Sequence, residues 1–323
     1  MFRTEIAQIE TEYKLDLKAQ ILAMGSCFAE NIGNRLGQFK FDVHTNPCGI
    51  LFNPISIFES IMLAIDDQDL PSDSYVQNES AYYNYKFHSS VNGYTKAKLN
   101  ERIESIRNEI KEQVSKTDYL ILTFGTAWVY ELANTNLLVA NCHKVPQKAF
   151  TKRLLSVTEI KDSCSELTKA LNKLNPDLKI IMTVSPIRHT REGLPNNGLS
   201  KAILRLACHE ICQNIPNVNY FPAFEVMMDD LRDYRFYEKD MIHPNEQAQD
   251  YIWEIFKNNY LSKSAIKFTS EWQHIISAMN HRAFQPKSTE HQAFLKNTLD
   301  KVKEFSTLVN TENEIDQLKK QII

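Results

Sequence analysis

Three short, almost entirely apolar runs constrain the fold of this chain more than any other feature. They cover residues 20–24, 119–124 and 179–184. Strands without polar alternation are typical of a parallel sheet that helices cover on both faces. Helical patterns lie between the runs, and this alternation predicts a doubly wound α/β sheet. The expected helices span residues 28–39, 54–65, 96–115, 156–174 and 199–213.

Two segments interrupt the alternation, and a third follows it. Residues 72–95 are rich in Tyr, Asn and Ser and indicate an inserted loop or hairpin, and residues 128–140 predict a β-hairpin with its turn near 134–136. After Tyr260 the strand patterns stop, and residues 274–283 and 291–320 have helical patterns rich in Lys, Glu and Gln. We therefore expect an α/β domain over residues 1–260 and a helical C-terminal extension over 261–323.

Composition excludes several classes of protein. Of 323 residues 43% are hydrophobic, enough for a real core, and a formal net charge of -3 gives no basic field for nucleic acid. No run approaches the roughly 20 apolar residues of a membrane span, and the N-terminus lacks a signal-peptide pattern. The six scattered cysteines fit a reducing compartment. We expect a soluble, cytoplasmic protein with no membrane partner, cofactor or metal; its oligomeric state is left open.

The first chemical signal is a serine in the turn after the first apolar run. In Met24-Gly25-Ser26-Cys27, a small residue and Ser26 stand where the strand gives way to a helix. Such a turn places the hydroxyl at the carboxyl edge of the sheet, where open α/β folds bind ligands. The free N–H groups of the helix N-terminus suit a developing oxyanion there. The alternative is that Ser26 only caps the helix.

The second signal is an aspartate three residues before a histidine. Asp240 and His243 precede Pro244 and the helical pattern that follows it. Histidine is the natural general base near neutral pH, and a carboxylate that turns back on its imidazole fixes the tautomer. An Asp-x-x-His pair alone is more often structural. Together, in the order Ser26, Asp240, His243, the residues predict a catalytic triad.

The motifs resemble one known family. Gly25-Ser26-Cys27-Phe28-Ala29 matches the signature of the GSCFA-domain family, which resembles a branch of the SGNH/GDSL hydrolase superfamily. Further stretches similar to the same family lie at residues 46–54, 124–128, 141–146, 183–189 and 232–237. The resemblance covers about residues 25–260. It implies a three-layer α/β/α fold with a mainly parallel, SGNH- or flavodoxin-like sheet, with Ser26 as nucleophile and Asp240 and His243 completing the triad.

The resemblance also implies an oxyanion hole, with one departure from the superfamily pattern. The hole would combine the Ser26 N–H with a glycine N–H from the second block, for which Gly49 is the candidate, and an Asn side chain from the third. The third block, normally Gly-x-Asn-Asp, here begins at Gly125 and has Ala127 in place of the Asn. Either a side chain from another loop replaces it or the hole uses backbone N–H groups alone. The candidate side chains are Asn46, Asn53 and His143.

Further residues near the expected sheet edge have two readings each. His143 lies in an expected loop and either donates to substrate or belongs to a hydrogen-bonded surface loop. Arg188 and His189 follow the third apolar run and either bind ligand at the rim or make a structural salt bridge. Cys27 is a neighbouring thiol, but adjacent side chains diverge in such a turn. We expect Ser26, not Cys27, to face His243.

These residues predict a serine hydrolase that cleaves ester (O-acyl) bonds through an acyl-enzyme. A small-molecule or carbohydrate ester is the expected substrate. An O-acyltransferase is the enzymatic alternative, because a carbohydrate or polymer hydroxyl can capture the same acyl-enzyme. From another class, the chain would be a non-catalytic binding protein on a decayed hydrolase fold. Ala127 favours that reading, whereas the intact triad opposes it.

Overall fold

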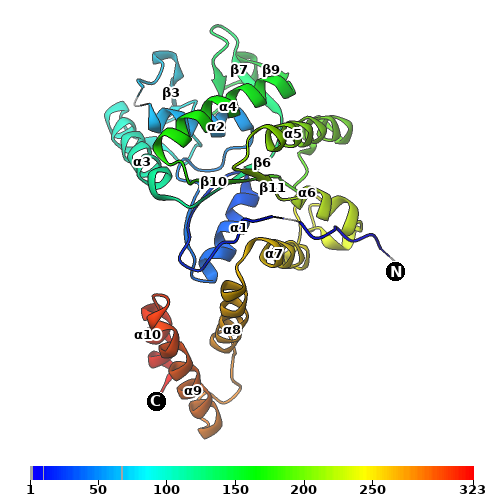
Figure 1. Cartoon of the computed structure of the whole chain (residues 1–323). Coiled ribbons are helices and arrows are strands. Elements are labelled where there is room, and N and C mark those ends of the chain that lie inside the picture. Colours follow the sequence, from blue (N-terminus) through cyan, green and yellow to red (C-terminus); the bar gives the residue numbers. More distant parts are fainter. Residues whose placement is uncertain (1–2, 10, 67) are drawn as a thin grey trace.

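A five-stranded parallel sheet forms the centre of the protein (Figure 1). The computed structural model describes residues 3–9, 11–66 and 68–323. The strand order is β11-β10-β6-β1-β2, and every neighbouring pair is parallel. The order therefore reverses direction between β1 and β6, the switch point at which doubly wound sheets bind ligands. The strands are β1 (Gln20–Gly25), β2 (Asp42–Thr45), β6 (Tyr119–Phe124), β10 (Lys179–Val184) and β11 (Val218–Tyr220).

Helices cover both faces of this sheet. In Figure 1, α2, α3, α4 and α5 lie on one face, and α1 and α7 lie on the other. Successive side chains of β6 enter different cores: Leu120 and Leu122 pack in one hydrophobic cluster, Tyr119 and Ile121 in the other. This confirms the predicted three-layer α/β/α fold. The helices are α1 (Cys27–Gln38), α2 (Pro54–Ile65), α3 (Lys96–Lys116), α4 (Val157–Leu174), α5 (Leu194–Asn214), α6 (Ala223–Glu225) and α7 (Glu246–Tyr260).

Element bounds within the sheet domain follow the sequence pattern closely, with two exceptions. Helix α5 begins at Leu194 instead of residue 199, because Pro195 lies in its first turn and fixes a helical φ. The edge strands β2 and β11 were not predicted. They have only four and three residues, too few for an apolar run to stand out.

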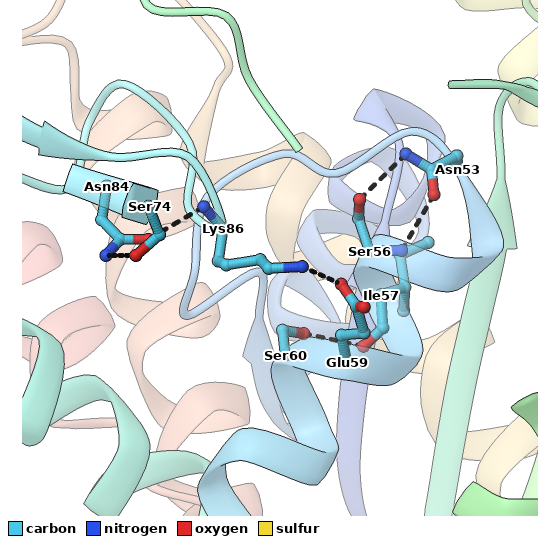
Figure 2. Close-up of polar contacts among 8 residues, drawn as sticks. All are labelled: Asn53, Ser56, Ile57, Glu59, Ser60, Ser74, Asn84 and Lys86. Atoms are coloured by element: carbon cyan, nitrogen blue, oxygen red, sulfur yellow. Dashed lines mark hydrogen bonds and ion pairs between the residues drawn. The ribbon is translucent and has the colours of Figure 1, made fainter. Parts of the chain in front are cut away.

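Two small antiparallel sheets are inserted beside the main one (Figure 1). The first comprises β3 (Tyr75–Asn78), β4 (Ala81–Asn84) and β5 (Asn92–Gly93), which confirms the hairpin expected in residues 72–95. The second comprises β7 (Trp128–Leu132), β8 (Leu138–Val139) and β9 (Phe150–Leu154), of which β7 and β8 form the other predicted hairpin. Figure 2 shows how the first insertion is fastened to α2: Lys86 Nζ lies 2.9 Å from Glu59 Oε2.

The C-terminal segment is helical, but its bounds differ from those predicted. Its helices are α8 (Lys263–Met279), α9 (Thr289–Glu304) and α10 (Glu312–Gln321). Helix α8 begins well before residue 274 because the Ser262 hydroxyl caps it, and the expected helix over 291–320 is divided after a 3₁₀ turn at Phe305–Thr307. The segment packs on the sheet domain: Trp272 is buried and donates from Nε1 to Gln38 O at 3.1 Å. None of the helices in the described ranges has the length and apolar character of a membrane span.

Candidate functional site

The turn between β1 and α1 lies at the switch point of the sheet. Gly25 has a φ of 136°, and a Cβ there would lie 2.1 Å from Thr123 O of β6, so this position admits only glycine. Ser26 follows as the N-cap of α1: its Oγ accepts a 3.4 Å contact from Phe28 N, and its N–H donates to Thr123 O at 3.0 Å. Ser26 is fully buried in this conformation.

Asp240 and His243 are paired through their side chains. His243 Nδ1 lies 2.6 Å from Asp240 Oδ2, and Asp240 Oδ1 accepts the N–H groups of His243 at 3.0 Å and Ile242 at 2.8 Å. The backbone and side-chain hydrogen bonds from His243, followed by that from Ile242, lower the pKa of Asp240 to about 2. An ionised carboxylate can only accept, so in a neutral imidazole of His243 Nδ1 carries the proton and Nε2 presents a lone pair. About half of the His243 side chain is exposed.

Arg188 attaches the loop that contains Asp240 and His243 to the carboxyl end of β10. Its backbone N–H donates to Ile242 O at 3.4 Å, and Nη1 donates to Met241 O at 3.3 Å. Its guanidinium lies 4.2 Å from the centre of the Tyr237 ring. Met241 has a φ of 60°, a left-handed conformation that costs energy for a residue with a side chain. Arg188 therefore contacts the loop at the point where its backbone is strained.

A buried lysine at the same edge was missed in the sequence. Lys201 is 1% exposed and donates from Nζ to Gly125 O and Ser185 O, both at 2.7 Å. It thereby joins the carboxyl ends of β6 and β10. Burial lowers its pKa to about 7. The signal was a lysine three residues before Leu204 on the buried face of a helix, a position normally apolar.

His189 lies near both Lys201 and His243. Burial, and then the nearby charges of Lys201 and His243, lower the pKa of His189 to about 3, so its ring is neutral near neutral pH. The ring meets Phe52 edge-on, with centroids 5.4 Å apart. Its Nε2 is buried and has no hydrogen-bond partner among the described residues. A Cβ on Gly125 would lie only 2.9 Å from that nitrogen, so the imidazole sits directly over the glycine.

The backbone donors expected for an oxyanion hole are already engaged. Gly49 N–H donates to Asn46 O at 2.8 Å, and Gly125 N–H donates to Phe52 O at 2.7 Å. The Ser26 N–H is likewise occupied by Thr123 O. A backbone-only hole would require at least one of these bonds to be shared or to shift.

The three candidate side-chain donors for the oxyanion hole differ in whether they already make hydrogen bonds. Asn53 caps α2 through Oδ1 and donates from Nδ2 to Ser56 Oγ at 2.9 Å (Figure 2). His143 uses both ring nitrogens, Nε2 with Asn84 O at 2.9 Å and Nδ1 with Ser89 Oγ at 3.1 Å. By contrast, Asn46 accepts from Gly25 N at 2.8 Å, while its buried Nδ2 has no partner among the described residues.

The structure does not join all three triad positions. In the part of the chain that it describes, no hydrogen bond connects Ser26 Oγ with His243. Cys27 is half-buried and packs against the core below the sheet, and burial raises the pKa of its thiol. Nowhere in the described ranges do three or more His, Cys, Asp or Glu side chains form a group that could hold a metal ion.

Comparison with known proteins identifies the family. The GSCFA family profile matches residues 20–256, well over half of the chain. The chain belongs to the GSCFA family. The five residues that give the GSCFA family its name, residues 25–29, form the β1–α1 turn of this member. A second profile, described as the C-terminal domain of GSCFA domain proteins, matches residues 272–323, which include the C-terminal part of α8 and all of α9 and α10.

Similarity of this GSCFA chain to characterised proteins is low. No curated protein matches it significantly. Among solved structures, a carbohydrate esterase family 3 protein from Talaromyces cellulolyticus is similar over 51% of this chain, with 14% sequence identity and a TM-score of 0.29. The match spans 66% of that protein, just under two thirds of its length. The strand order of the GSCFA chain itself is what defines its fold.

Proposed function

We propose that this GSCFA protein is a serine hydrolase of ester bonds, with Ser26 as nucleophile, His243 as general base and Asp240 as the group that orients it. The observation that carries the proposal is the Asp240–His243 pair, which leaves His243 Nε2 as a proton acceptor. The pair belongs to a loop at the carboxyl edge of the sheet, and Ser26 belongs to the turn at the switch point of that edge. Family membership supports the same reaction class.

The proposed reaction has two steps, acylation of Ser26 and hydrolysis of the acyl-enzyme. The Ser26 Oγ–H bond breaks and its proton passes to His243 Nε2 while Oγ bonds to the acyl carbon. The ester C–O bond then breaks, and the alcohol leaves with that proton. Water next gives a proton to His243 Nε2 while its oxygen bonds to the acyl carbon. The bond between Ser26 Oγ and the acyl carbon then breaks, Oγ takes the proton from His243, and the acid is released. Asp240 stabilises the imidazolium in both steps without itself taking the proton.

Substrate binding must expose the Ser26 hydroxyl for this reaction to occur. Catalytic hydrogen bonds are often long or absent before a substrate binds and tighten in the complex. The half-exposed His243 side chain lies on a surface loop, whereas Ser26 is anchored between a strand and a helix. We therefore propose that the loop bearing His243 moves toward Ser26.

A pair of neighbouring variants tests the proposal. On an activated acetyl ester, Ser26→Ala should lose at least about three orders of magnitude in kcat, the loss typical of a removed triad member. Cys27→Ala should retain most activity, because that side chain packs against the hydrophobic core on the α1 and α7 face of the sheet. Equal activity in wild type and Ser26→Ala would refute the proposal. Loss confined to Cys27→Ala would indicate a thiol enzyme.

One observation favours a second candidate, a binding protein on a hydrolase fold. The N–H groups of Ser26, Gly49 and Gly125 each bond to a carbonyl, so none of these three expected donors is free to receive an oxyanion. This candidate predicts ligand binding without turnover in both wild type and Ser26→Ala. The third candidate, an O-acyltransferase, predicts that an added sugar alcohol diverts the acyl group from water without slowing ester consumption.

A further inference from the structure

A cavity of about 540 Å³ opens beside the loop that carries Asp240 and His243. Its wall includes Ile242, which lies between the two dyad residues, and His189 and Thr126 at the ends of β10 and β6. The inserted strands β7 and β9 also line the cavity, through Tyr130 and other residues. The volume is in the range of small-molecule sites. The insertion therefore completes a compartment next to the proposed catalytic residues.

Cationic side chains dominate the charge of this cavity. Its charged lining comprises Lys144, Lys152, Arg188, Arg191 and the single acid Glu192. Glu192 is paired with Lys152, which neutralises both. The other three cations have no carboxylate partner among the described residues, in a chain whose formal net charge is -3. Asp240, in the bordering loop, already faces His243.

Two polar groups without partners belong to the same lining. Tyr130 Oη and His189 Nε2 are buried, and neither has a hydrogen-bond partner in the described part of the chain. Both atoms are shielded from solvent in this conformation, and a rotation of the side chains toward the cavity would let hydroxyl groups of a ligand pair with them. Apolar contact is available from Phe52 and Phe150, which also line the cavity. A polyhydroxylated ring with one anionic group fits this combination.

We propose that the cavity binds the alcohol part of the substrate, and that this part is a sugar carrying a carboxylate or phosphate group. Arginine binds either oxyacid in a bidentate, charge-assisted manner. Arg191 is the residue expected to set the preference, because it is exposed at the cavity wall and has no ion pair among the described residues. Arg188 is less suitable as a selector, because it also holds the dyad loop. The inference rests on the proposed ester hydrolysis.

Three matched substrates test this proposal: O-acetylated methyl glucoside, methyl glucuronide and glucose 6-phosphate. Acetate release by the full chain should show a kcat/KM roughly three- to tenfold higher for one or both anionic substrates, and Arg191→Gln should abolish that preference mainly through KM. Arg102→Gln is the control, because Arg102 is an exposed arginine of α3 outside the cavity lining. Preference for only one anion would identify the oxyacid.

A measurement of ligand binding without hydrolysis distinguishes failure of this inference from failure of the proposed function. Unacetylated methyl glucuronide and glucose 6-phosphate should raise the melting temperature of the wild type and the Arg102→Gln variant, but not of Arg191→Gln. Methyl glucoside should have the smaller effect. Binding without any hydrolysis would overturn the proposed hydrolase and retain the cavity assignment. Hydrolysis with equal kcat/KM for neutral and anionic substrates, or equal losses in Arg191→Gln and Arg102→Gln, would overturn the assignment.

Discussion

Asp240 and His243 form a carboxylate–imidazole pair whose Nδ1–Oδ2 distance is 2.6 Å. Asp240→Asn keeps the size of the side chain but can offer an N–H to His243, which favours the wrong tautomer. We expect kcat on an activated ester to fall by about three to four orders of magnitude. The melting temperature should change little, because the pair is exposed. A variant with near wild-type kcat would show that Asp240 does not orient the base.

The same pair sets the behaviour at low pH. The pKa of Asp240 is depressed to about 2, so the interaction is present above its ordinary pKa near 3.8 and is lost as pH falls through 2. Asp240 therefore remains charged between about pH 4 and 8. Titration of Asp240 should add no inflection to the profile of kcat/KM against pH in this range, and an inflection that disappears in Asp240→Asn would contradict this expectation.

Asn46 tests the origin of the oxyanion donor. Its Nδ2 is unpaired and its Oδ1 accepts from Gly25 N, so Asn46→Asp removes the donor while it keeps an acceptor. If Nδ2 donates to the oxyanion, Asn46→Ala and Asn46→Asp should each lower kcat roughly a hundredfold or more, with a smaller change in KM.

Asn53→Ala serves as the control for that experiment. It removes the α2 cap and should cost about 1 kcal/mol of stability with little effect on kcat. An unchanged kcat in Asn46→Asp would eliminate Nδ2 as the donor. A large drop in kcat for Asn53→Ala at a temperature where it remains folded would transfer the role to that residue.

Lys201 gives a prediction for stability. Its pKa in the folded protein is about 7, below the ordinary value of 10.5, so the unfolded chain binds more protons between these two values. Stability of the wild type relative to Lys201→Met should therefore rise with pH across that window, by at most about 1.4 kcal/mol per pH unit. Urea unfolding of both proteins at pH 7, 8, 9 and 10 measures this difference. A difference independent of pH would contradict a buried, titrating lysine.

The sequence predicts the layers of this protein better than the contacts of its site. Apolar runs that became β1, β6 and β10 are long enough to identify a buried sheet, and the Gly25-Ser26 turn locates its functional edge. The sequence pattern does not predict which backbone N–H group each backbone carbonyl group will accept from. That the Ser26 N–H would meet Thr123 O, for example, depends on how β6 pairs with β1 in space.

Two further differences have physical causes. Lys201 was overlooked because a lysine in a helical pattern ordinarily reads as solvent-exposed, whereas here Gly125 O and Ser185 O compensate its burial. The break between α9 and α10 was overlooked because the sequence there has neither Pro nor Gly. In contrast, the Asp240–His243 pair could be anticipated, because both residues belong to one short loop.

A fluorophosphonate probe, with the labelled peptide identified by mass spectrometry, measures whether the Ser26 hydroxyl is activated. We expect labelling of the wild type at Ser26, none at that position in Ser26→Ala, and much slower labelling in His243→Ala. Cys27→Ala should label like the wild type. A folded wild-type protein that does not label, or that labels equally in Ser26→Ala, would contradict the assignment of Ser26 as the nucleophile.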